Sequence, residues 1–524
     1  MKSRIITLLT LLMLGTLSGF AAERPRLVVN IVVSGMTNSD LVRYEQGFCE
    51  GGFKRLLGGE FYPQAYYSFA PTTPSALATL TTGALPSEHG VVGRVWWHQN
   101  TRHKVGVVED AGYCTYGNDS DEARVSNVNL QFETLGDVVV GSYEGARSVT
   151  VATDAEAAII LGGMNPSEVW WIDDLGATWT TSTKYTASLP KWVNNYNRTA
   201  PWRKRIGQPW VLSRGGDKYV NEESVVAKPH GYKLTSEEKS RGVRAVDLRE
   251  FKHSSLCNDV VAEFAKEAIV YNRLGGDDRV DVLNVCFLSP RKIAARYGLH
   301  SREMEDMYYR LDEALADLVK FASAQASGKV VFVLTTDGGC SEVKGQERVY
   351  NATQAQFLVN SFLSATYGKG DWVLGADGTN LWLNHTQVFS KGLDLATVQR
   401  QAAGFALQFR GVSHAVTSSE LSSGGYDEGV KAALQDGYYP KHSPDLMLVL
   451  MPGWGVAYGE DEVPKTTSSQ PYAALRRSFV ALSGHGIESL CKISERVDIR
   501  SVVVTLAEML GVESPVAADC EPLP

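Results

Sequence analysis

The sequence predicts an α/β protein with a central, mostly parallel sheet that helices cover on both faces. Residues 27–33 form a β-branched apolar run between Pro25 and Ser34-Gly35, as expected of a strand buried on both faces. Similar runs recur at 148–152, 282–288, 330–335 and 479–482. Helical patterns such as 301–324 separate these runs, and such alternation is typical of α/β folds.

Each predicted strand ends in a polar or glycine-bearing turn. The turns are Ser34-Gly35, Asp154, Ser289-Pro290-Arg291, Asp337-Gly338-Gly339 and Ser483-Gly484-His485-Gly486. Ligands of open α/β sheets bind at the carboxyl ends of the strands, so we expect the functional site at this edge.

Two segments interrupt the alternation. Residues 166–250 are rich in Trp, Tyr and Asn without periodicity, which predicts an irregular cap. Residues 352–454 predict an inserted small α/β subdomain, with helices near 355–367 and 395–409 and strands near 372–374, 380–383 and 446–450. The α/β core would then consist of residues 23–165, 251–351 and 455–524.

The first 22 residues have the pattern of a secretory signal peptide. Lys2 and Arg4 precede the apolar run 5–17, and small residues up to Ala21-Ala22 follow it. We expect export to the periplasm or the extracellular space and a soluble mature chain, because no later apolar stretch reaches the length of a membrane span. A buried first helix is the alternative.

Charge and cysteine content narrow the possible partners. The chain of 524 residues has 51 Lys+Arg and 59 Asp+Glu, a net charge of −8. Long basic runs are absent, so a nucleic acid polymer is not an expected ligand.

The seven cysteines are an odd number without CxxC spacing, and the expected bridge is Cys491–Cys520.

A set of motifs covers almost the whole mature chain. They lie at 24–33, 51–57, 71–73, 82–93, 301–312, 335–339, 437–446, 471–472 and 479–486. Together they resemble the alkaline phosphatase superfamily, in the branch of exported bacterial alkaline phosphatases similar to nucleotide pyrophosphatase/phosphodiesterases. The resemblance implies an alkaline-phosphatase-like three-layer sandwich with a central mostly parallel sheet and inserted cap segments.

The resemblance also implies a two-zinc site that this sequence does not reproduce. The family holds two Zn²⁺ ions with Asp and His ligands, and its metal-bound nucleophile corresponds to Thr73. The former metal positions fall on Ser34, Arg291, Ala295, Asp337, Gly338 and Ser468. Only Asp337 keeps a ligand, and one carboxylate with one hydroxyl does not hold two ions. We therefore expect no metal and no cofactor.

The positions that the resemblance assigns to phosphate contacts also lack the family's residues. By the resemblance, Asp154 and Glu156 stand where the exported phosphatases have Lys and Arg, and Arg94 replaces an Asn. Carboxylates repel phosphate. We expect Arg291 or Arg94 to substitute for a zinc ion, with a nitrogen within about 4 Å of Asp337, Asp154 or Glu156.

Several of the residues singled out above also have a purely structural interpretation. Thr73 is also suited to cap the helix that opens at Pro74. Asp337 alone is more often a hydrogen-bonded loop residue than a ligand, and a replacement metal site using His300 has no supporting spacing. The Trp-rich cap is first of all a local core, with ligand stacking as its alternative.

Two functions follow. The favoured one is a pseudoenzyme that keeps the fold for binding a small ligand or an envelope protein. The alternative is a metal-dependent phosphoric ester hydrolase, mono- or diesterase, whose remodelled site uses Thr73 and zinc. Fold alone does not choose between them.

Overall fold

The computed structural model describes residues 24–206, 210–221, 245–345, 347–457, 464–487 and 491–524. Within these residues the largest sheet has nine strands in the order β20-β2-β19-β10-β1-β9-β6-β7-β8. Its strands are β1 (Leu27–Val33), β2 (Glu60–Tyr62), β6 (Ser148–Ala152), β7 (Glu168–Ile172), β8 (Trp179–Thr180), β9 (Asp281–Phe287), β10 (Val330–Thr335), β19 (Val480–Gly484) and β20 (Cys491–Lys492).

The centre of this sheet is parallel and its margins are mixed. Strand β1 runs parallel to both β9 and β10, and β6 runs parallel to β9 and β7. Antiparallel pairs join β10 to β19, β19 to β2, and β7 to β8. The prediction of a mostly parallel sheet is confirmed, and its central strands lie where the apolar runs placed them.

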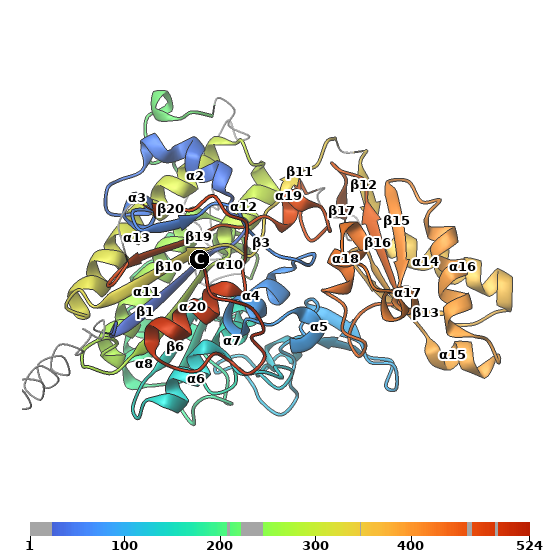
Figure 1. The fold of residues 1–524 in the computed structure, drawn as a ribbon, viewed down its shortest axis with the longest axis horizontal. Helices are drawn as coiled ribbons and strands as arrows, with labels where there is room; N and C mark the ends of the chain where they lie inside the picture. The colour runs from blue at the N-terminus through green and yellow to red at the C-terminus, as the bar shows by residue number, and fades with distance from the viewer. Residues whose placement is uncertain (1–23, 207–209, 222–244, 346, 458–463, 488–490) are drawn as a thin grey trace, which may run out of the picture.

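Helices cover both faces of the sheet, as Figure 1 shows. One face carries α2 (Asn38–Tyr44), α3 (Phe53–Leu56), α8 (Lys191–Thr199), α10 (Ala245–Lys252), α11 (Ser255–Asn272), α12 (Ser289–Tyr297) and α13 (Arg302–Gln325). The other carries α4 (Thr73–Thr82), α6 (Leu135–Ser142), α7 (Ala155–Gly162) and α20 (Ser501–Leu510). Alternate residues of β1 divide between the two cores: Val29 and Ile31 face the first, Val28 and Val32 the second. The three-layer architecture predicted from the sequence is confirmed.

The inserted subdomain has its own four-stranded sheet and its own core, in orange in Figure 1. It contains α14 (Ala352–Tyr367), β13 (Val373–Asp377), β14 (Asn380–Leu383), α15 (His385–Ser390), α16 (Leu395–Ala406), β15 (Val412–Thr417), α17 (Ser418–Ser423), α18 (Gly429–Gln435) and β16 (Leu446–Leu450). The sequence did not predict β15, because this edge strand is partly exposed and interrupts its apolar residues with Ser413 and His414.

Short elements connect these parts. They are β3 (Ala65–Tyr66) with β21 (Val497–Asp498), β4 (Val95–Trp97) with β5 (Lys104–Gly106), β11 (Ser341–Glu342) with β18 (Thr466–Thr467), β12 (Val349–Asn351) with β17 (Gly455–Ala457), and the helices α5 (Pro86–His89) and α19 (Ala473–Arg476). The β4–β5 hairpin contacts the inserted subdomain, because the Trp97 ring lies 4.9 Å from that of Trp382.

The Trp-rich segment 166–250 starts with β7 and β8, which extend the large sheet. Trp179 stacks on Phe264 of α11 with 3.9 Å between ring centroids, and Trp170 also packs against Phe264. Both indoles are buried and closed to a ligand, which favours the interpretation as a local core.

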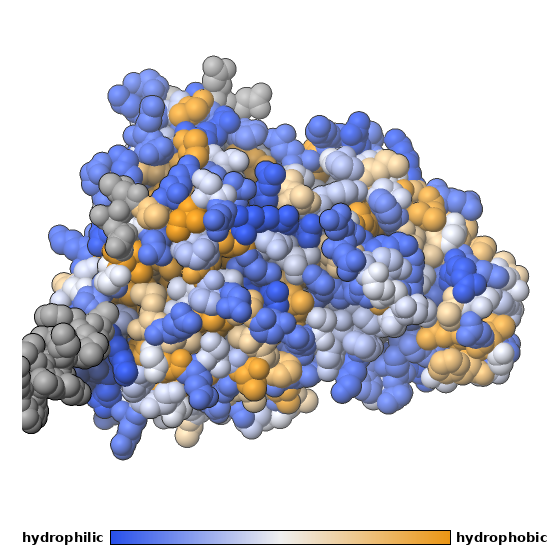
Figure 2. Space-filling model, viewed as in Figure 1, coloured by the Kyte–Doolittle hydropathy of each residue, from blue (hydrophilic) through white to orange (hydrophobic). Residues whose placement is uncertain are grey.

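Several expectations concern the ends and the surface of the molecule. The expected signal peptide, 1–22, lies outside the described residues. Among the helices of the described residues, none has the length and apolarity of a membrane span. The expected Cys491–Cys520 bridge is wrong, since both are free thiols; Cys491 is exposed on the edge strand β20. Polar and apolar residues are interspersed over the face shown in Figure 2.

Candidate functional site

A cavity of about 460 Å³ lies at the carboxyl edge of the central strands, between the core and the inserted subdomain. Core residues in its lining include Ser34, Thr73, Arg94, Asp154, Glu156, Arg291 and Lys292. The subdomain contributes Asp377, Thr379, Trp382, Met447 and Leu448, and the loop 464–471 contributes Ser468 and Ser469. The edge predicted from the sequence is therefore the one that carries the cavity.

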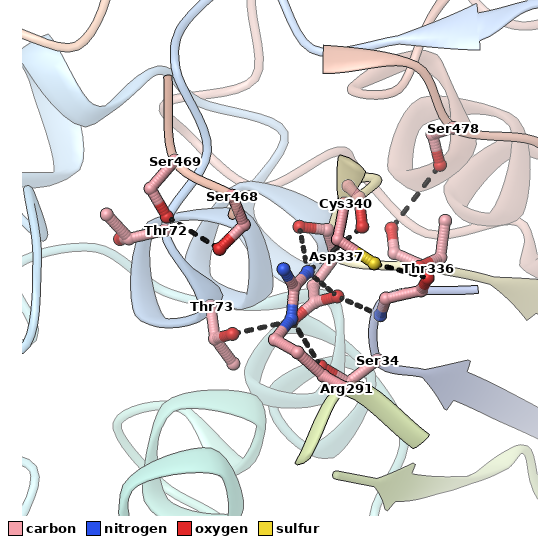
Figure 3. Close-up of polar contacts among 12 residues, drawn as sticks. Ser34, Thr72, Thr73, Arg291, Thr336, Asp337, Cys340, Ser468, Ser469 and Ser478 are labelled. Atoms are coloured by element: carbon pink, nitrogen blue, oxygen red, sulfur yellow. Dashed lines mark hydrogen bonds and ion pairs between the residues drawn. The ribbon is translucent and has the colours of Figure 1, made fainter. Parts of the chain in front are cut away.

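Asp337 follows β10 at the base of the site and is fully buried. Its Oδ2 accepts hydrogen bonds from the hydroxyls of Ser34, at 2.7 Å, and Thr73, at 2.6 Å (Figure 3). Its Oδ1 accepts from the Gly35 amide, at 2.8 Å, and from Arg291 Nη2, at 2.6 Å. A carboxylate has about four acceptor positions, so protein donors occupy all of them.

Arg291 supplies the cation of this group. It is the third residue of α12, and its Nε also donates to Ser34 Oγ at 3.0 Å. Nη2 donates in addition to the carbonyl of Gly338 at 2.9 Å. Gly35 has φ +75, and a Cβ there would lie 3.1 Å from Arg291 Cβ, so a glycine suits this close approach. The prediction that an arginine pairs with Asp337 is confirmed.

The charge state of Asp337 follows from these contacts. Burial alone would raise the pKa of the carboxyl, because it disfavours the charged form. The Arg291 guanidinium and the hydroxyls of Thr73 and Ser34 outweigh burial and hold the Asp337 pKa below its usual value. Asp337 is therefore a fixed anion and a weak base.

Thr73 is the first residue of α4 and does not cap it. The cap is Thr72, whose hydroxyl accepts from the amide of Ser75 at 3.3 Å. The expectation that Thr73 caps the helix is wrong by one residue, since the Thr73 hydroxyl turns to Asp337 instead. Thr73, the residue that the resemblance assigns to the family's nucleophile, thus lies next to the buried ion pair.

A second charged group lies at the start of α7. The Asp154 carboxylate accepts hydrogen bonds from Lys292 Nζ, at 2.8 Å, and from Nζ of the buried Lys252, at 3.2 Å. Burial would raise the Asp154 pKa, but these two ammonium groups hold it far below its usual value. Neither lysine was expected from the sequence. Lys292 directly follows Arg291, which was expected at the site, and this adjacency is the signal that could have found it.

Glu156 pairs with Arg94, with Nε 3.2 Å from Oε2. The expected contact of Arg94 with a carboxylate is confirmed. The Arg94 side chain is 73% exposed, so this pair contributes little to stability. Burial raises the pKa of Glu156.

The other positions that the resemblance assigns to metal ligands offer no such ligand. Ala295 lies on α12, and Gly338 has φ +96 with Pro71 packed against it. Ser468 lies on the cavity wall and contacts Ser469, with 3.5 Å between their hydroxyl oxygens. His300 is exposed and lies 3.7 Å from Glu342, and it does not line the cavity.

The donor set does not fit two zinc ions. The acceptor positions of Asp337 are taken, and its nearest neighbour is a guanidinium, which repels a metal cation. In the part of the chain that the structure describes, no three His, Cys, Asp or Glu side chains form a group that could hold a metal ion. Zinc sites take several such ligands for each ion.

The sequence was compared with protein families and with known proteins. The family model described as type I phosphodiesterase / nucleotide pyrophosphatase matches residues 28–473. The chain is 24% identical to alkaline phosphatase PafA of Elizabethkingia meningoseptica, over 98% of this chain and 96% of that one. It is 27% identical to alkaline phosphatase PhoV of Synechococcus elongatus, over 82% and 81% of the two chains.

Solved structures show the same fold. The crystal structure of wild-type alkaline phosphatase PafA superimposes with a TM-score of 0.86 and 24% identity, covering 96% of this chain and 99% of that one. The murine ectonucleotide pyrophosphatase / phosphodiesterase 5 superimposes with a TM-score of 0.56 and 11% identity, covering 93% and 95%.

Proposed function

The chain belongs to the type I phosphodiesterase / nucleotide pyrophosphatase family, and we propose that it binds a ligand in the cavity without hydrolysing phosphoric esters. One observation carries the proposal. Four donors from Ser34, Gly35, Thr73 and Arg291 occupy the carboxylate of Asp337, the ligand that remains by the family resemblance.

Two-metal hydrolysis needs cations that stabilise both the attacking and the leaving oxygen. Beside Asp337 the cation is the Arg291 guanidinium, and its charge is already balanced by Asp337 at 2.6 Å. Asp154 and Glu156 add two carboxylates to the lining of the cavity, each paired with a cation. A phosphate dianion therefore meets little uncompensated positive charge.

The Thr73 hydroxyl also lacks activation. It donates to Asp337, and a carboxylate with a lowered pKa is a poor acceptor of a full proton. A threonine hydroxyl is a weak nucleophile unless a base or a metal ion activates it. This arrangement supports a structural role for the Thr73–Asp337 contact.

A second candidate function is hydrolysis of phosphate mono- or diesters at a remodelled site. The comparisons favour it, because two relatives that match 98% and 82% of the chain are named alkaline phosphatases. Thr73 lines the cavity together with Arg291, so a guanidinium would be available beside the reacting oxygen. In this function Thr73 would be indispensable.

Steady-state turnover of aryl phosphate and bis-aryl phosphate, measured with and without added zinc, separates the two candidates. We expect background rates for the wild type, for Thr73→Ala and for the distant control Thr366→Ala. Zinc-dependent turnover that Thr73→Ala abolishes and Thr366→Ala retains would establish the hydrolase instead.

The proposal includes the cell envelope as the place of action. It depends on the signal peptide expected at 1–22. N-terminal sequencing of the protein from a periplasmic or culture-medium fraction should begin at Ala22 or Glu23. A chain in the cytoplasm that starts at Met1 would contradict export.

A further inference from the structure

One nitrogen of the buried guanidinium is left over. Arg291 Nε donates to Ser34, and Nη2 donates to Asp337 and to the carbonyl of Gly338. Among the described residues no acceptor contacts Nη1. In Figure 3 one guanidinium nitrogen carries no dashed line and faces the side where Ser468 lies. Arg291 and Ser468 line the same cavity. Nη1 is therefore a charged donor that is open to a ligand.

Ser468 and Ser469, here called the serine pair, belong to the lining of the same cavity. Their hydroxyl oxygens lie 3.5 Å apart, and Ser469 adopts φ 60, which a serine adopts only at a cost in strain. Apart from their contacts with each other, no partner of either hydroxyl occurs in the described residues. Two hydroxyls and the two hydrogens of Nη1 together offer about four donors.

The charge around the cavity limits what these donors accept. The lining contains three cations, Arg94, Arg291 and Lys292, and three carboxylates, Asp154, Glu156 and Asp377. Such a balanced lining suits a ligand with one negative charge better than a dianion. The N-terminus of α4, at Thr73, also lies at the cavity and favours an anion modestly.

Apolar side chains form another part of the lining. They include Leu288, Trp382, Met447 and Leu448. An organic ligand would rest its apolar body on these residues, while its anionic end reaches the donors. Four donors match the acceptor positions of a carboxylate, whereas the three terminal oxygens of a phosphate group offer more acceptor positions than the site has donors.

We propose that the cavity binds a small organic carboxylate, with its oxygens held by Arg291 Nη1 and the serine pair. This inference rests on the proposed function, since it assigns a ligand class to the same non-hydrolytic cavity. The cation that holds the ligand is Arg291, which occupies a position that the resemblance assigns to a metal ligand.

Ligand-observed saturation-transfer NMR with butyrate, in the presence of a chelator, tests this proposal. Butyrate should bind the wild type saturably. Its neutral isostere butyramide should bind at least tenfold more weakly, because it lacks the charge that Nη1 contacts. Ser468→Asp places a carboxylate beside Nη1 and should weaken butyrate binding at least tenfold, while the exposed control Ser390→Asp leaves it unchanged.

A second variant guards against misfolding of Ser468→Asp. The double variant Ser468→Ala/Ser469→Ala removes donors without adding charge and should weaken butyrate binding at least threefold. No saturable butyrate binding, equal binding of butyramide, or displacement by ethyl phosphate at tenfold lower concentration would each overturn the carboxylate assignment. Turnover is a separate readout: hydrolysis of aryl phosphate contradicts the proposed function but leaves the butyrate result standing.

Discussion

Arg291 Nη2 lies 2.6 Å from Asp337 Oδ1, and this ion pair joins the start of α12 to the end of β10. The carboxylate is fully enclosed and the guanidinium side chain is 19% exposed. A buried charge of this kind is tolerated only when a partner compensates it. The arginine therefore supplies, within the chain, the positive charge that Asp337 needs.

Arg291→Met tests this dependence. The variant leaves Asp337 buried without a cation, so it should lose about 3–5 kcal/mol of unfolding free energy at pH 7. Urea denaturation measures the loss. The control is Arg94→Met, which removes an exposed pair and should cost less than about 1 kcal/mol.

The same variant should change the dependence of stability on pH. In the wild type the Asp337 pKa is lowered, so its contribution is present above the unfolded value near 3.8 and is lost as the pH falls through the folded value. Without Arg291, burial raises the Asp337 pKa, and acid then relieves the penalty. The stability gap between variant and wild type should shrink from pH 7 to pH 4, and a constant gap would contradict this account.

Ser34→Asp introduces a carboxylate at a position that the resemblance assigns to a metal ligand, yet we expect no gain of activity. The new carboxylate would face Asp337, whose Oδ2 now accepts from Ser34 at 2.7 Å, so like charges meet in a buried site. The expected loss is about 2–4 kcal/mol, against about 1 kcal/mol for Ser34→Ala. Aryl phosphate turnover above background in Ser34→Asp would show that most of a metal site is intact.

Gly338 should not tolerate a side chain. It has φ +96, and a Cβ would lie 2.8 Å from Pro71 Cγ. Gly368 has φ +95 with no atom within 4 Å of its Cβ position, which makes it a matched control for backbone strain. Gly338→Ala should be less stable than Gly368→Ala by about 1–3 kcal/mol in thermal unfolding. Equal losses would show that a side chain, and thus a histidine ligand, fits here.

Lys252 should be a strong contributor to stability although it does not itself line the cavity. Its side chain is 3% exposed, and Nζ contacts Asp154, Asp174 and the carbonyl of Ile172. Lys252→Met should cost about 2–4 kcal/mol, since these acceptors lose their shared donor. The exposed pair Lys54–Glu50 gives the control: Lys54→Met should leave the denaturation midpoint nearly unchanged in the same assay.

The sequence was sufficient for the core of the fold, and it limited the main ion pair to two arginines and three carboxylates. Continuous apolar runs located β1, β6, β9 and β10 because strands buried on both faces need them. It did not give the direction of β19, since an antiparallel strand at the centre of a sheet has the same apolar pattern.

Contacts in the site that depend on how far a side chain extends could not be predicted from the sequence. Lys252 approaches Asp154 from another helix, and nothing in the local pattern around Lys252 indicates that contact. The turn of the Thr73 hydroxyl toward Asp337 likewise depends on how α4 meets the end of β10. Pairing of Arg291 or Arg94 with Asp337, Asp154 or Glu156 could be expected, because these residues follow predicted strands or motifs at one edge of the sheet and a buried carboxylate needs a cation.

Zinc content tests the central claim most directly. The purified mature protein, incubated with excess zinc and passed through gel filtration, would be measured by elemental analysis. If Arg291 has taken the place of a metal ion, the protein should retain far less than one zinc per chain. Two zinc ions per chain would contradict the account, because Asp337 would then have to exchange its four protein donors for a metal ligand set.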